Sequence, residues 1–236
     1  MHREFILGCL LMLGCNSPLP KGVVRVPAGE ATSHIAGPMP DFGPFKTYSD
    51  ALLAACPLLL SLPNAVTESP NNPNFKLHWN LSTEYCAWIY HTPEGQYEMS
   101  MVATSMSQMD TRLRTCDLPT SVRDSRYPEE SLDYVFVVHN HPVGNPLSRR
   151  DIRFIAMQGS IHGFSFKAGE REVPLVMVAF FSHGDSGHPS CDGFFQYIPA
   201  TGELLKWMHE SQGGWTQEKY GSVTWTDPDN FDIELQ

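Results

Sequence analysis

The chain has 236 residues, of which 42% are hydrophobic and 18% charged, a composition typical of a globular protein with a substantial core. Its formal net charge is −10, from 26 acidic against 16 basic residues, and no basic stripe is present, which argues against nucleic acid as a partner. The acidic residues are scattered along the chain, so they predict a solvated surface and not a binding tail.

The first 15 residues have the pattern of an export signal. Their apolar stretch, residues 5–13, is too short to span a bilayer and fits the core of a signal peptide. Met12-Leu13-Gly14-Cys15, which begins at the end of this stretch, resembles the bacterial lipoprotein box, in which the cysteine is lipidated and becomes the new N-terminus. We therefore expect residues 1–15 to be a lipoprotein-type signal peptide, Cys15 to carry the lipid, and the protein to be anchored in a membrane of the bacterial cell envelope. The alternatives are a plain secretory signal with a secreted product, a rival box at Cys9, and an unusual first helix of a cytoplasmic protein.

Four cysteines lie beyond this signal: Cys56, Cys86, Cys116 and Cys191. An exported protein folds in an oxidising compartment, so we expect two disulfides, in any of three pairings. No Cys-x-x-Cys pair is present, which argues against cysteine-based zinc or thioredoxin chemistry.

The proline pattern predicts how the chain is divided. Residues 16–45 contain six prolines and predict an extended tether between the anchor and a domain over residues 46–236. Residues 47–60 predict a helix with Ser49 as N-cap, ended or kinked at Pro57. Residues 63–80, rich in proline and asparagine, predict a loop.

The later elements alternate between strands and helices. They are, in chain order, a β-hairpin over 84–103 turning at 92–95, a buried strand over 132–141, a short helix over 148–160 with Ser148 as N-cap, a second buried strand over 172–181 and a second hairpin over 193–208. This order predicts an α/β (α+β) fold, with a mixed β-sheet and flanking helices.

A candidate metal site lies at the end of the first buried strand. His139 and His141 are two residues apart in a strand, so both side chains face one side and can reach one ion. Asp151, one turn into the following helix, is a natural third ligand, since catalytic zinc takes three protein ligands and keeps a fourth position for water. The histidine pair and the Ser148-x-x-Asp151 unit each also have a purely structural explanation. Histidines can mark where a buried strand reaches water, and Ser148-x-x-Asp151 is a capping box. Their combination within thirteen residues favours a zinc site.

This pattern resembles a known family. His139-Asn140-His141-Pro142 followed by Ser148-x-x-Asp151 resembles the His-x-His-Pro…Ser-x-x-Asp motif of the JAMM (MPN+) zinc metallopeptidases, which include deubiquitinating isopeptidases and bacterial relatives. The stretch "EYCAWIY", residues 84–90, resembles the glutamate-bearing strand of a bacterial branch of JAMM-like domains. The resemblance covers roughly residues 46–210. It implies a JAMM/cytidine-deaminase-like architecture and a Zn²⁺ ion held by His139, His141 and Asp151.

The same resemblance implies a reaction and a role for each residue. The reaction is hydrolysis of a peptide or isopeptide bond by water whose pKa the zinc ion lowers to about 7. Glu84 would be the general base and then the general acid, and Ser148 would donate a hydrogen bond to the developing oxyanion. Glu94 and Glu98 are rivals for Glu84, but we expect both to face solvent.

Two features depart from the family pattern. His141 and Ser148 enclose six residues where the family has seven, and this shorter loop is either absorbed or displaces Asp151. Cys86-Ala87 stand where the family often has glycines. The alternatives are therefore a metal-poor JAMM-like binding or scaffold module without catalysis, and another metal-dependent hydrolase such as a deamidase. The expected substrate is a peptide or protein, and a ubiquitin-like protein is not expected for an envelope enzyme.

The loop over residues 183–193 contains further polar side chains. His183, Asp185, His188 and Asp192 could form a second metal site, although polar, glycine-rich residues between two strands usually form only a loop. We expect Trp88 and Trp207 to belong to the core.

Overall fold

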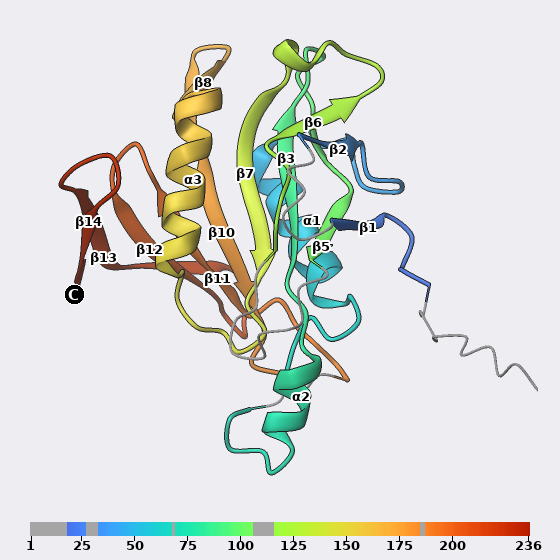
Figure 1. Cartoon of the computed structure of the whole chain (residues 1–236), viewed down its shortest axis with the longest axis vertical. Coiled ribbons are helices and arrows are strands. Elements are labelled where there is room, and N and C mark those ends of the chain that lie inside the picture. The colour runs from blue at the N-terminus through green and yellow to red at the C-terminus, as the bar shows by residue number, and fades with distance from the viewer. Residues whose placement is uncertain (1–17, 27–32, 68, 106–115, 185–186) are drawn as a thin grey trace, which may run out of the picture.

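The computed structural model describes residues 18–26, 33–67, 69–105, 116–184 and 187–236 (Figure 1). Within these ranges the chain is an α+β protein, with a mixed ten-stranded sheet, two small two-stranded sheets and three α-helices. This confirms the predicted mixed sheet with flanking helices. Cys15 and the rest of the expected signal peptide lie outside the described residues.

The main sheet contains most of the strands. In spatial order these are β1 (Val23–Val26), β5 (Val102–Ser105), β3 (Tyr85–His91), β7 (Asp133–Asn140), β10 (Val176–Phe181), β11 (Gly193–Ile198), β12 (Glu203–His209), β13 (Trp215–Trp225) and β14 (Phe231–Leu235), with β4 (Tyr97–Met99) paired to β3. The small sheets pair β2 (His34–Gly37) with β6 (Ser121–Asp124), and β8 (Ser165–Ala168) with β9 (Arg171–Pro174). The helices are α1 (Tyr48–Leu60), α2 (Phe75–Leu81) and α3 (Arg149–His162), and a short 3₁₀ turn covers Glu129–Ser131.

Strand β7 is central and carries the histidines at its end. It pairs antiparallel with β3 and parallel with β10, and α3 makes the crossover between β7 and β10. Phe136 and Val138 belong to the core cluster that includes α1, whereas Val137 packs with Ile152 and Ile155 of α3. The two helices therefore cover opposite faces of the sheet (Figure 1), which explains why β7 is a continuous apolar run.

Several local predictions are confirmed. The hairpin expected over 84–103 is β3 and β4, joined by a turn at Thr92–Gly95 in which Gly95 N donates to Thr92 O at 2.9 Å. The hairpin expected over 193–208 is β11 and β12. The buried strand expected over 172–181 is confirmed only for its second part, because β9 ends at Pro174 and the buried β10 begins at Val176.

The structure corrects two details of the first helix. Its N-cap is Thr47 and not Ser49, because Thr47 Oγ1 accepts the Asp50 N–H at 3.1 Å. Pro57 lies inside α1, so of the two expected effects, an end or a kink, the end is wrong. The helix continues because the residues after Pro57 include fully buried Leu59 and Leu60, whose burial compensates for the missing backbone donor.

The expected tether and the expected loop both contain regular structure. Residues 16–45 include β1, which pairs with β5, and β2, which pairs with β6. The described part of this segment therefore belongs to the folded domain and is not a free linker. The loop expected over 63–80 contains most of α2, a helix without a buried residue. The tail over 210–236, for which no element is predicted, forms β13 and β14.

All four cysteines beyond the expected signal peptide form disulfides, Cys56–Cys191 and Cys86–Cys116. Cys56 lies on α1 and Cys191 just before β11, so the first bond ties this helix to the second half of the sheet. Paired structural disulfides are typical of proteins outside the cytoplasm. Within the described ranges, no helix combines the length and the apolarity needed to cross a bilayer.

Candidate metal centre

The structure brings the three predicted ligands together. His139 and His141 are each 4% exposed, and their Nε2 atoms lie 2.9 Å apart at the end of β7. Asp151, in the first turn of α3, has Oδ1 at 3.7 Å from His139 Nε2 and Oδ2 at 3.7 Å from His141 Nε2. One ligand atom from each residue lies within 4.8 Å of the other two. The shorter loop is therefore absorbed and does not displace Asp151.

The loop over residues 142–147 and the start of α3 fix Asp151. Ser148 Oγ accepts the Asp151 N–H at 3.2 Å, and Asp151 Oδ2 accepts the Ser148 N–H at 2.7 Å, which confirms the capping box. Gly144 has a φ of 66° and lies against Phe181, so the chain reverses there in a conformation that glycine adopts at little cost. These local contacts hold the helix start over the end of β7.

The donor set fits a divalent cation. His141 Nδ1 lies 2.6 Å from the Asn145 carbonyl, which can only accept, so in the neutral ring Nδ1 carries the hydrogen and Nε2 presents a lone pair. Two histidines with one carboxylate form a ligand set typical of catalytic zinc. Two atoms bound to tetrahedral zinc are about 3.3 Å apart, a value between the measured 2.9 and 3.7 Å.

Burial and mutual charge set the protonation of these groups. Burial lowers the pKa of His139 to about 4, so its ring is neutral near pH 7, as a ligand must be. Burial alone would lower the pKa of His141, but the hydrogen bond and charge of Asp151 and the charge of Glu84 raise it above the ordinary value. Burial also opposes ionisation of Asp151, yet the two histidines and Ser148 hold the pKa of its carboxyl well below the usual range.

Glu84 lies beside this centre. It precedes β3, is partly buried, and lines the same cavity as His139, His141 and Ser148. Its two rivals do not line this cavity. Glu94 is exposed in the hairpin turn, whereas Glu98 is 2% exposed and forms a 2.6 Å ion pair with Arg126. The expectation that Glu98 faces solvent is wrong, because the guanidinium group compensates its buried charge.

Asn140 positions Glu84 and is not singled out by the sequence analysis. It is fully buried between the two histidines and, by strand alternation, faces the other side of the sheet. Its Oδ1 accepts the Tyr85 N–H at 2.7 Å, and its Nδ2 donates to Thr83 O at 3.0 Å and Ala65 O at 2.6 Å. The residues on both sides of Glu84 are thus tied to the strand that carries the histidines. The sequence feature that could have pointed to Asn140 is its amide side chain inside the apolar run of β7, because a buried amide requires hydrogen-bond partners.

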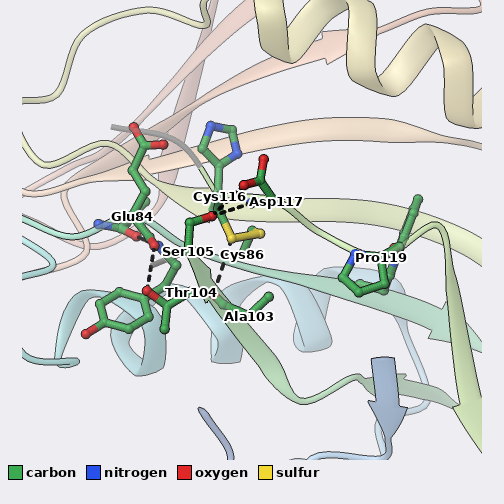
Figure 2. The surroundings of a disulfide bond; sticks show 12 residues. Glu84, Cys86, Ala103, Thr104, Ser105, Cys116, Asp117 and Pro119 are labelled. Atoms are coloured by element: carbon green, nitrogen blue, oxygen red, sulfur yellow. Dashed lines mark hydrogen bonds between the residues drawn. A yellow bond between two sulfur atoms is a disulfide. The ribbon is translucent and has the colours of Figure 1, made fainter. Parts of the chain in front are cut away.

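The ligands open into a cavity of about 510 Å³. Besides the metal-centre residues it is lined by the Cys86–Cys116 disulfide and by apolar side chains from β7, β10 and α3. Cys86 pairs with His139 across β3 and β7, so the disulfide lies next to a ligand. Figure 2 shows this disulfide together with Glu84 and Asp117.

The loop after β10 forms no comparable group. Among the described residues, only His139, His141 and Asp151 meet the geometry of a metal site, and Asp185 lies outside the described ranges. Asp192 Oδ2 accepts the His183 N–H at 2.6 Å, which closes the loop. Trp88 is fully buried, as expected, and Trp207 packs against the core while partly exposed.

Comparison with protein-family models, with curated proteins and with solved structures finds no match to this chain.

Proposed function

We propose that this protein is a zinc-dependent hydrolase of the JAMM type that cleaves a peptide or isopeptide bond. The observation that carries the proposal is the convergence of His139, His141 and Asp151 in one cavity with Glu84 and Ser148. The arrangement also supports a JAMM-like architecture, because the glutamate precedes one central strand, the histidines end its neighbour, and the aspartate begins the crossover helix.

His139, His141 and Asp151 would hold the ion. Zinc bound there supplies Lewis-acid chemistry and a water molecule that ionises near neutral pH. The Glu84 carboxylate takes the proton of the attacking water and passes it to the leaving amine. The Asp151 N–H fixes the position of Ser148 Oγ, while the hydroxyl hydrogen can rotate toward a substrate carbonyl oxygen.

Two variants test these roles. Glu84→Gln should keep zinc and lose hydrolysis by about 10²–10⁴-fold, whereas His141→Ala should lose zinc. Atomic absorption measures the zinc content, and mass spectrometry of a peptide mixture measures cleavage. Equal zinc in the two variants would refute the assignment of roles.

The two alternatives predict different outcomes in the same experiment. A scaffold module binds no stoichiometric zinc or has no Glu84-dependent activity. The shorter loop no longer argues for this alternative, because Asp151 stays within 3.7 Å of both histidines. A deamidase would release ammonia from free amides in a substrate panel and leave peptide bonds intact.

The proposed setting is the bacterial cell envelope. The signal would be cleaved before Cys15, which would then carry the lipid; with a plain secretory signal, the product would be secreted instead. In either case the folded domain would act on a peptide or protein outside the cytoplasm. The two disulfides support this setting, since such bonds persist in oxidising compartments.

A further inference from the structure

We infer that the metal centre acts on substrates that carry an apolar side chain next to the bond being cleaved. An apolar subsite adjoins the three ligands within the same cavity. We define this subsite by four residues, Leu118, Val137, Phe154 and Met177. The inference rests on the proposed function and deepens it by naming the class of substrate.

The floor of the subsite continues the strand that carries the ligands. Val137 precedes His139 by two residues on β7, so the two side chains face the same way, about 6.6 Å apart along the strand. Met177 pairs with Val137 in the register of β7 and β10. Both side chains line the cavity and are buried, so the floor next to the ligands is apolar. In an extended substrate, the residue next to the cleaved bond could therefore place its side chain on this floor, about 6.6 Å from the ligands along the strand.

The walls come from α3 and from the segment after the Cys86–Cys116 disulfide. Phe154 follows Asp151 by three residues on α3, so it lies on the same side of the helix one turn further on. Leu118 also lines the cavity and is buried in the core cluster against which Phe154 packs. The subsite is therefore formed by residues that follow Asp151 on α3 and Cys116 of the disulfide along the chain.

The Leu118 wall is fixed before any substrate binds. Cys116 is bonded to Cys86, and Asp117 exchanges hydrogen bonds of 2.9 and 3.0 Å with Ser105 (Figure 2). On the other side, the Pro119 carbonyl accepts the Trp88 indole N–H at 2.8 Å. A preformed pocket loses little free energy to ordering when it takes up a ligand, which favours tight binding of a matching side chain.

The apolar lining of the subsite disfavours an acidic side chain. The same cavity is also lined by the charged residues Arg149, Arg150, Glu84, Asp117 and Asp151, but none of them belongs to the four subsite residues. Arg150 donates to Asp117 Oδ1 at 2.8 Å, so these two charges are paired with each other. An acidic side chain among the four apolar residues would lose its hydration without gaining a partner, whereas an aliphatic one would only leave water.

Binding of amino-acid hydroxamates to the zinc-loaded full chain tests this inference without turnover. The hydroxamate group binds the metal, and the side chain reports the subsite. By calorimetry, N-acetyl-leucine hydroxamate should bind about tenfold or more tightly than N-acetyl-glycine hydroxamate, and the aspartate probe should bind more weakly than the glycine probe. Equal affinity for the leucine and glycine probes would overturn the inference.

A pair of variants on α3 locates the preference. Phe154→Ala removes one wall and should reduce the leucine-to-glycine ratio to about threefold or less. Met157→Ala, on the exposed side of the same helix, is the matched control and should leave the ratio unchanged. Zinc content shows that each variant keeps its centre. A ratio that survives Phe154→Ala would show that the subsite lies elsewhere and overturn the assignment.

The two proposals fail in different ways. Zinc binding with a leucine preference but no hydrolysis of any peptide would refute the hydrolase and leave the subsite standing. Hydrolysis without a preference for apolar neighbours or for the leucine probe would refute the subsite and leave the hydrolase standing. A chain that takes up no zinc would overturn both.

Discussion

Replacing Asn140 with alanine removes three hydrogen bonds at once. These bonds join the buried amide to Tyr85 N, Ala65 O and Thr83 O at 2.6 to 3.0 Å. Each contributes about 1 kcal/mol net, and the backbone groups left behind are shielded from water. We therefore expect the free energy of unfolding to fall by about 3 kcal/mol or more.

Urea unfolding followed by tryptophan fluorescence, with the disulfides intact, measures this loss. On heating, the midpoint should fall by about 6–12 °C. Gln158→Leu is the matched control, because Gln158 is also a fully buried amide but neither of its side-chain polar atoms has a hydrogen-bond partner among the described residues. Removing two polar atoms that are already unsatisfied should be neutral or stabilising.

The same Asn140 variant has a functional readout. Because Asn140 holds the residues on both sides of Glu84, its loss should move the carboxylate while the zinc ligands remain. A displacement of about 1 Å can reduce the rate about 10²-fold, so we expect full zinc content and strongly reduced hydrolysis. A stability loss below about 1 kcal/mol, or an equal loss in Gln158→Leu, would refute the hydrogen-bond argument.

Two further predictions concern other buried groups. Arg126 Nη2 lies 2.6 Å from both Glu98 and Asp124. Arg126→Ala leaves two buried carboxylates without their counter-charge, so the free energy of unfolding should fall by about 3 kcal/mol at pH 7 and by less at pH 4, where the carboxylates can protonate. Urea unfolding that gives the same loss at both pH values would contradict this. Burial lowers the pKa of His162 despite its hydrogen bond to the Thr120 carbonyl, so the unfolded chain binds a proton at higher pH than the folded chain does. The contribution of neutral His162 to the free energy of unfolding is therefore fully present above about pH 7, and it is lost progressively as the pH falls below about 6.5. The loss between about pH 7.5 and 5.5 should therefore be smaller in His162→Phe, and an unchanged loss would count against the argument.

The features predicted correctly depend on residues close together in sequence. The alternation of a strand places His139 and His141 on one side, and a capping box places Asp151 at the start of α3. The turn of the first hairpin, residues 92–95, is also local. For this reason the candidate ligand set could be proposed before the structure was known.

The features that were missed depend on distant partners. β1 is a short valine-rich stretch within a proline-rich segment, and its place in the sheet depends on the pairing of Val23–Val26 with Val102–Ser105. Pro57 is tolerated in α1 because the tertiary core buries the turn after it. Asn140 gains its role from Ala65, Thr83 and Tyr85, which are adjacent only after folding.

The polar groups at the end of β7 support a metal-binding role over a purely structural one. His139 and His141 are buried and Asp151 is largely so, at positions where apolar side chains of similar size would be at least as stabilising. The packing of β7 against β3 and β10 does not require an imidazole at this position, because the residues that pair with His139 are the disulfide-bonded Cys86 and Ala179. A divalent ion bound here would coordinate both Nε2 atoms, which lie 2.9 Å apart, and would compensate the charge of the Asp151 carboxylate. The proposed metal site would therefore account for the cost of this polar end, which the packing of the strands does not explain.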